Sequence, residues 1–194
     1  MNDAAAAIRK VLLDGRKGDA RPARVRQAAP AAEAPWRGAD RLVHELSGSS
    51  RMLPRRITDR DRDQFLKDGL EAAATVFTDG LQQLSRQDSR IDSEFERVDS
   101  RSFTATVYVN GDTVGFCRVF AGDQTFGRSL CLSFDSRSTN GMNEWLTIED
   151  GRGNLLFKSH MGYSHATREQ AMDEAAAANY LWEMFLSQLQ SRLR

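Results

Sequence analysis

The sequence predicts an α+β domain in which an antiparallel sheet of four to five strands packs against two long helices. Two apolar stripes with helical spacing, in residues 58–86 and 167–193, predict the helices. Between them, short segments of alternating apolar and polar residues predict strands joined by tight turns. No helix separates the strands, so we expect an antiparallel meander. Both helices are expected to cover the same face, which gives a two-layer sandwich.

The distribution of charge divides the chain near residue 57. Residues 1–57 carry 12 Lys and Arg against 6 Asp and Glu, whereas residues 58–194 carry 15 against 21. The first part is also rich in Ala and Pro and poor in large apolar residues, a composition typical of disorder. We therefore expect a flexible basic arm over residues 1–57 and one globular domain over residues 58–194.

Two short apolar segments interrupt the arm, at residues 3–13 and 36–46. The first has the spacing of a short helix with Asp3 as its N-cap, and the second begins at Trp36. Helices of this length are marginal alone in water, so each segment needs a surface on which to fold. We expect both to bind a protein partner through Ile8, Val11, Leu12, Trp36, Leu42, Val43 and Leu46.

Residues 58–86 are predicted to form the first long helix of the domain. Thr58 and Asp61 have the spacing of a capping box, with Asp in place of the usual Glu or Gln. Gly69 and Gly80 lie beside the apolar stripe, where the lack of a side chain permits close packing. The stripe consists of Leu66, Leu70, Ala73, Phe77, Leu81 and Leu84.

The strongest turn motif is Asn110-Gly111, which predicts a two-residue hairpin between strands at 102–109 and 112–120. A regular hairpin would give these core-face pairs: Val107 with Val114, Ala105 with Phe116, and Phe103 with Arg118. The opposite face is expected to be polar to mixed, and to meet solvent or a partner. Its predicted members are Thr104, Thr106, Tyr108, Thr113 and Cys117.

The remaining elements follow from similar patterns. Strands are predicted at residues 93–98, 129–135, 144–149 and 155–159, and the last two are joined by a turn containing Gly151 and Gly153. The final helix is expected to begin at Thr167, with Gln170 completing a capping box. Its predicted apolar face consists of Met172, Ala175, Asn179, Trp182, Leu186, Leu189 and Leu193.

Motifs that name a reaction are missing from the sequence. It has no phosphate-binding loop, no dinucleotide fingerprint, no His-Glu-x-x-His and no Gly-x-Ser-x-Gly. Glu144, Glu149, Asp150 and Lys158 come closest to a nuclease-like cluster, but this composition is usual for an exposed hairpin. We therefore expect no cofactor and no metal, and Cys117 and Cys131 are expected to be buried free thiols.

The best position for a ligand site is the connection over residues 158–170, between the last strand and the last helix. It gathers His160, Tyr163 and His165 in one loop, and such junctions often carry function. The alternative interpretation is a polar connector that carries no function, because no acidic residue or Cys lies beside these side chains in the sequence.

The basic arm allows a second kind of partner, a nucleic acid. Phosphate groups need only cations, and two clusters of arginine supply them: Arg21, Arg24 and Arg26, then Arg51, Arg55 and Arg56. Stacking on bases would require aromatic residues, and the arm has only Trp36. An inert, solvated tether is the third interpretation of the same charges.

The sequence favours a non-enzymatic function: an adaptor, chaperone-like or accessory subunit that binds a protein partner through its arm and through the exposed sheet face. A nucleic-acid-binding accessory protein and a small-ligand sensor or enzyme using the 158–170 loop are the alternatives. No apolar run approaches the ~20 residues that span a bilayer, and no secretory signal is evident, so a cytoplasmic location is expected. A homo-oligomer is compatible with the apolar helix faces.

Overall fold

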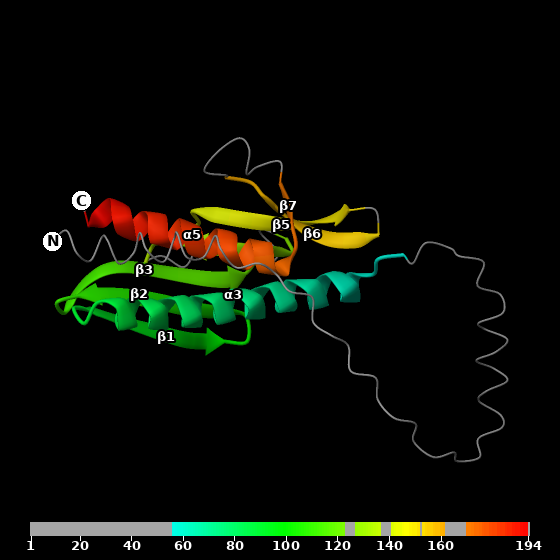
Figure 1. The fold of residues 1–194 in the computed structure, drawn as a ribbon. Coiled ribbons are helices and arrows are strands. Elements are labelled where there is room, and N and C mark those ends of the chain that lie inside the picture. The colour runs from blue at the N-terminus through cyan, green and yellow to red at the C-terminus, as the bar shows by residue number, and fades with distance from the viewer. Residues whose placement is uncertain (1–55, 123–126, 137–140, 152, 162–169, 194) are drawn as a thin grey trace, which may run out of the picture. The chain divides into compact units, whose positions relative to one another are not determined.

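The computed structural model describes residues 56–122, 127–136, 141–151, 153–161 and 170–193. These residues form an α+β fold with two long helices and one antiparallel sheet, as the sequence predicts (Figure 1). The sheet has seven strands rather than four to five, in the order β1-β2-β3-β4-β5-β6-β7. Both apolar segments of the arm lie outside the described residues, so the predicted disorder and docking of the arm stay predictions.

The helices are α3 (Asp59–Gln87) and α5 (Glu174–Arg192). The strands are β1 (Ile91–Asp99), β2 (Ser102–Val109), β3 (Asp112–Ala121), β4 (Ser129–Ser133), β5 (Glu144–Gly151), β6 (Asn154–Ser159) and β7 (Ala171–Met172). Each strand pairs with the next one along the chain, which is the predicted meander. The strand predicted at residues 93–98 is part of β1, and β7 forms where helix was expected.

Both helices lie on one face of the sheet (Figure 1). Near the beginning of α3, Phe65 stacks on Phe157 of β6 with ring centroids 4.6 Å apart. Near its end, Ser85 lies 2.9 Å from Ser93 of β1, Oγ to Oγ. The helix therefore crosses almost the whole width of the sheet. The opposite face, which we call the outer face, carries neither helix.

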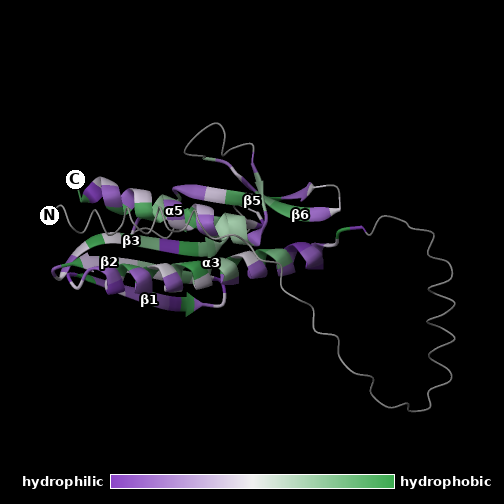
Figure 2. Ribbon diagram, in the orientation of Figure 1, coloured by the Kyte–Doolittle hydropathy of each residue, from purple (hydrophilic) through white to green (hydrophobic). Residues whose placement is uncertain are grey.

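The two helices meet at a glycine. A Cβ placed on Gly80 of α3 would lie 2.3 Å from Cζ2 of Trp182 on α5, so no other residue fits without a shift. Phe77 packs edge-on against the same indole at 5.1 Å and stacks on Phe185 at 5.8 Å. All six residues of the predicted α3 stripe are buried. Buried residues alternate with partly exposed ones along β3, so one face of the strand meets this layer of aromatic rings, although the strand is largely hydrophobic in composition (Figure 2).

The predicted register of the first hairpin is wrong by one residue. The turn itself is as expected, because Asn110 and Gly111 both have left-handed φ angles of 54° and 87°. A β-bulge at Val114 shifts the pairing of all later residues of β3 with β2 by one position. The observed pairs are Val107 with Gly115, Ala105 with Cys117 and Phe103 with Val119. A slip of one residue exchanges the two faces, so Cys117 lies in the core and Arg118 lies on the outer face.

The predicted start of the last helix is also wrong. Residues 162–169 lie outside the description, Gln170 belongs to no helix, and Ala171–Met172 pairs with β6 as β7. Asp173 caps the helix instead, since its Oδ1 accepts from Ala176 N at 2.7 Å. Two residues of the predicted apolar face, Ala175 and Asn179, are exposed in consequence.

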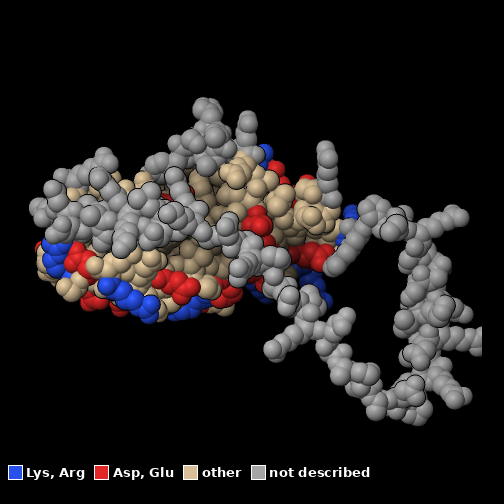
Figure 3. Space-filling view, in the orientation of Figure 1, with Lys and Arg blue, Asp and Glu red and all other residues tan. Residues whose placement is uncertain are grey.

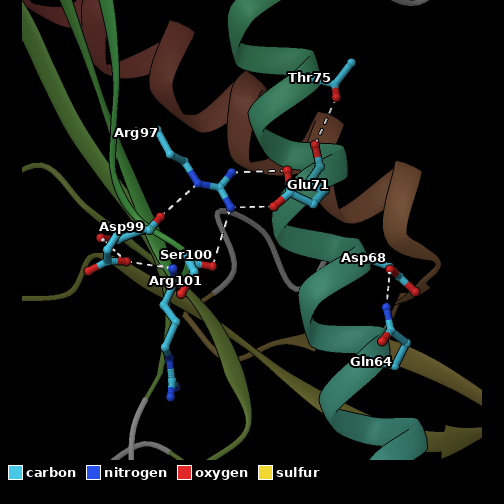
Figure 4. Close-up of polar contacts among 9 residues, drawn as sticks. Gln64, Asp68, Glu71, Thr75, Arg97, Asp99, Ser100 and Arg101 are labelled. Carbon is cyan, nitrogen blue, oxygen red and sulfur yellow. Dashed lines mark hydrogen bonds and ion pairs between the residues drawn. The ribbon is translucent and has the colours of Figure 1, made fainter.

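The start of α3 confirms the capping box. Thr58 Oγ1 accepts from Asp61 N at 3.2 Å, and Asp61 Oδ2 accepts from Thr58 N at 2.9 Å. Further along α3, Glu71 receives a fork of two hydrogen bonds from Arg97 of β1 (Figure 4). Arg97 Nε also donates to the carbonyl of Asp99 at 2.9 Å, which ties the end of β1 to the helix (Figure 4). An exposed pair of this kind contributes about 0–1 kcal/mol.

The connection between α3 and β1 provides a pH-dependent test of the fold. Asp88 accepts from Nε of Arg90 at 3.0 Å and from Nη2 at 2.6 Å, and these bonds lower its pKa from 3.8 to about 2. The ionised form therefore favours the folded state. Its stabilisation is fully present above pH 3.8 and is lost as the pH falls toward 2.

We expect NMR titration of the Asp88 carboxyl to give a pKa near 2 in the native chain, and a higher value in Arg90→Gln. Asp88→Asn is expected to lower the urea midpoint at neutral pH and to have no effect on it once the carboxyl is protonated in both states. A native carboxyl that titrates near 3.8 would contradict this account of the connection.

Candidate functional site

A carboxylate is fully buried at the beginning of β5. Side chains alternate along this strand, so Glu144, Leu146 and Ile148 point to the helix layer while Trp145 and Thr147 point to the outer face. Glu144 has no exposed surface. A buried carboxylate is costly unless it is hydrogen-bonded, so its partners define what this position does.

Three backbone amides donate to one oxygen of this carboxylate. Oε1 of Glu144 accepts from Trp145 N at 2.9 Å, from His160 N at 3.2 Å and from Met161 N at 2.9 Å. The amide of Trp145 thus bonds to the side chain of the preceding residue. The two other amides belong to the segment that leaves β6, so Glu144 fixes the backbone of that segment.

Two hydroxyl groups donate to the other oxygen. Oε2 of Glu144 accepts from Ser159 Oγ at 2.8 Å and from Tyr180 OH at 2.6 Å. We call Glu144, Ser159 and Tyr180 the Glu144 cluster. It links β5, β6 and α5, and its five donors suit the ionised carboxylate, which can only accept. Because Glu144 has no exposed surface, its direct role is to hold these elements rather than to contact a substrate.

His160 is exposed on the outer face, and the cluster holds its backbone in place. Its imidazole stacks on the indole of Trp145, with ring centroids 5.4 Å apart and an interplanar angle of 9°. Its Nε2 lies 2.8 Å from Oγ1 of Thr147, within hydrogen-bond distance. Tyr163 and His165, the other predicted ligand residues, lie outside the described residues. The structure therefore groups His160 with Trp145 and Thr147.

A row of side chains crosses the outer face at this level. The register places Phe120 beside Cys131 and Cys131 beside Trp145, and the stack continues to His160. We call these four residues the aromatic row. Phe120 and Trp145 are partly exposed, and neither belongs to the core cluster beneath the sheet. The row is thus a second apolar layer, on the face that carries neither α3 nor α5.

Arg118 lies next to this row on β3. Its guanidinium carbon is 5.1 Å from the ring centroid of Phe120, a cation–π contact. Its Nε is buried and has no hydrogen-bond partner among the described residues. Phe116, two residues earlier, is also partly exposed on this face. An arginine among aromatic rings with an unused donor is a composition typical of protein interfaces.

The two thiols occupy opposite faces of the sheet, are not joined in a disulfide, and are both fully buried. Burial raises the pKa of Cys117 well above its usual value. That residue is unreactive, as the sequence predicts, although it lies in the core rather than on the outer face. Cys131 belongs to the aromatic row.

Other predicted residues do not converge. Glu149 and Lys158 form an exposed ion pair at 3.2 Å, whereas Glu144 is buried and takes no part in it. Within the described ranges, His, Cys, Asp and Glu form no group of three or more that could hold a metal ion. Of the six arm arginines, the structure describes Arg56, which is exposed. Neither α3 nor α5 combines the length and apolar character needed to cross a bilayer.

The fold and this site define a class: an α+β domain whose meander is covered by helices on one face and carries an aromatic row on the other. Residues 92–187 match the family model described as "Y4lF protein domain". A protein of Sinorhizobium fredii (strain NBRC 101917 / NGR234), named "Uncharacterized protein y4lF", is 32% identical over 178 residues, which is 90% of this chain. The chain covers 54% of that relative, about half its length. No solved structure matches this chain.

Sequence reasoning missed the Glu144 cluster. It placed Glu144 with Glu149 and Asp150 as a hairpin surface charge. The position of Glu144 in its strand does indicate burial, because strand alternation puts it on the same face as Leu146 and Ile148. A charge at a core position requires partners, and Ser159 and Tyr180 supply them from other elements.

We predict that Tyr180→Phe lowers the free energy of unfolding by about 1.5–3 kcal/mol, because it removes a buried hydrogen bond to a charged acceptor. Tyr108→Phe is the matched control. Its hydroxyl donates to exposed Glu94 at 3.2 Å, so the loss there should stay under about 0.5 kcal/mol. Urea denaturation measures both variants. Equal effects of the two substitutions would contradict the structural role given to the cluster.

Proposed function

We propose that this chain is a non-enzymatic adaptor or accessory subunit that binds a protein partner through the outer face of its sheet and through its N-terminal arm. The observation that supports this most is the aromatic row beside Arg118 on the outer face, which carries neither α3 nor α5. Trp, Tyr and Arg dominate the binding energy of protein interfaces, and Phe is enriched there.

The physical argument starts from burial. Aromatic side chains on a solvated sheet face would gain free energy if a partner covered them, at about 25 cal/mol per Å² of apolar area. Phe116, Phe120 and Trp145 are all partly exposed in the described structure. Arg118 would gain an acceptor for its unused Nε at the same time. Both gains require a folded surface opposite the sheet, which a protein supplies.

The charge of the outer face disfavours a polyanion there. Asp92, Glu94 and Glu96 of β1 alternate with helix-facing residues and are exposed on the outer face. A nucleic acid on this face would meet these three carboxylates, while Lys158, a cation of the same face besides Arg118, is already paired with Glu149. The nucleic-acid alternative thus rests on the arm alone, through Arg21, Arg24, Arg26, Arg51, Arg55 and Arg56. The ligand alternative rests on His160, with Tyr163 and His165.

The test uses capture of partners from lysate by the full chain and by five variants. Phe116→Thr and Arg118→Gln change the outer face, and the double variant Leu12→Asp/Leu46→Asp changes the arm. Val98→Thr is the control, since Val98 is 51% exposed at the end of β1 and is not part of the aromatic row. Thr suits a strand, so the fold is expected to persist, which thermal denaturation verifies.

We expect one protein to be captured by the native chain and by Val98→Thr, and to be lost in the outer-face and arm variants at an unchanged thermal midpoint. Capture that is equal for all variants would contradict the proposal. Recovery of nucleic acid that falls steeply with salt and is lost in Arg51→Gln/Arg55→Gln/Arg56→Gln would favour the alternative instead.

A further inference from the structure

The sheet has a notch where β4 begins. Ser129 is the first residue of β4 and pairs with Thr147, whereas β5 runs on to Gly151 alongside β6 only. The first turns of α3 lie over this place, because Arg128 of the β3–β4 connection bonds to Asp59 and Asp63. The notch forms a pocket of about 340 Å³ that is separate from the Glu144 cluster and from the aromatic row.

Three elements line this pocket. They contribute Arg62 from α3, Gly127 and Arg128 from the β3–β4 connection, and Thr147 and Ile148 from β5. The wall at Gly127 is bare, since nothing lies within 4 Å of the place that a Cβ would occupy. Its φ of 63° is one that glycine adopts without strain. Two arginines, the backbone at Gly127 and two residues of β5 thus border one small volume.

Arg128 is held in place by its partners. Its Nε donates to Asp63 at 2.6 Å and its Nη1 to Asp59 at 2.9 Å. These bonds raise its pKa further, mainly through Asp63, so the guanidinium stays charged. Its Nη2 makes no hydrogen bond with the described residues. A guanidinium fixed on two of its nitrogens keeps the third for a bound group.

Arg62 is the second cation of the notch. Its side chain makes no hydrogen bond or ion pair within the described part of the chain, although it is partly buried. Arginine recognises phosphate and carboxylate through paired N–H donors. The two carboxylates that hold Arg128 reduce the net positive charge near the notch, so modest affinity is expected.

We propose that the notch binds a small oxyanion, a phosphate or carboxylate group, between Arg62 and Arg128, with Thr147 and Ile148 of β5 forming another wall of the site. This site is independent of the proposed adaptor function. The pocket adjoins His160, because Thr147 Oγ1 lies 2.8 Å from His160 Nε2. Binding against Thr147 therefore alters the surroundings of the imidazole and of the stacked Trp145 indole.

The experiment is a titration of the full chain with sodium phosphate and, separately, with sodium acetate, at ionic strength held constant with sodium chloride. Amide spectra of the ¹⁵N-labelled protein report Gly127 and Thr147, and the indole N–H reports Trp145. Arg62→Gln removes a cation of the notch. Arg60→Gln is the matched control, since Arg60 is exposed in the same helical turn and is not among the lining residues.

We expect saturable shifts of the Gly127 and Thr147 amides, with at least about a tenfold loss of affinity in Arg62→Gln and none in Arg60→Gln, since a charge-assisted contact is lost in only one of them. Saturation by phosphate alone would assign the site to a phosphate group, and by acetate to a carboxylate. Shifts that stay linear with both salts, or that are equal in the two variants, would overturn the proposal.

Discussion

Five hydrogen-bond donors converge on the buried carboxylate of Glu144, and the join of β5, β6 and α5 depends on that arrangement. Moving a carboxylate out of water costs several kcal/mol, which is offset only when its oxygens are fully satisfied. Here the hydrogen bonds that offset this cost come from β5, β6 and α5 together. The same bonds fix the backbone at His160, so the imidazole has one place to lie, on the Trp145 ring and beside Thr147. Thr147 in turn lines the notch.

The rest of the fold follows from covering only one face of the sheet. The α3–α5 contact, closed by Gly80 against Trp182, fills the helix layer with aromatic rings. On the outer face, the bulge at Val114 turns Arg118 and Phe120 away from that layer. This leaves an arginine and an aromatic row without a covering element among the described residues. An antiparallel sheet covered in this way has its core on one side and can present its other side to solvent.

Sequence alone predicted the fold class, the α3 stripe, the capping box at Thr58 and the turn at Asn110-Gly111, because each depends on residues close in the chain. Sequence analysis failed where contacts between residues far apart in the sequence decide the local structure. The bulge at Val114 brings Gly115 rather than Val114 opposite Val107, where it meets Leu189 of α5. Pairing with β6 takes Ala171 and Met172 out of the helix predicted from Thr167. The burial of Glu144 requires Tyr180, which lies 36 residues away.

The central claim is that the Glu144 carboxylate, as a charged acceptor, holds the backbone at the join of β5, β6 and α5. Native-state hydrogen exchange of Glu144→Gln tests it, because a neutral amide oxygen is a weaker acceptor in the same place. We predict that the amides of Trp145 and Met161 exchange about tenfold faster, while those of Val107 and Cys117 in the sheet core change far less. Unchanged protection at Trp145 and Met161 would contradict the account.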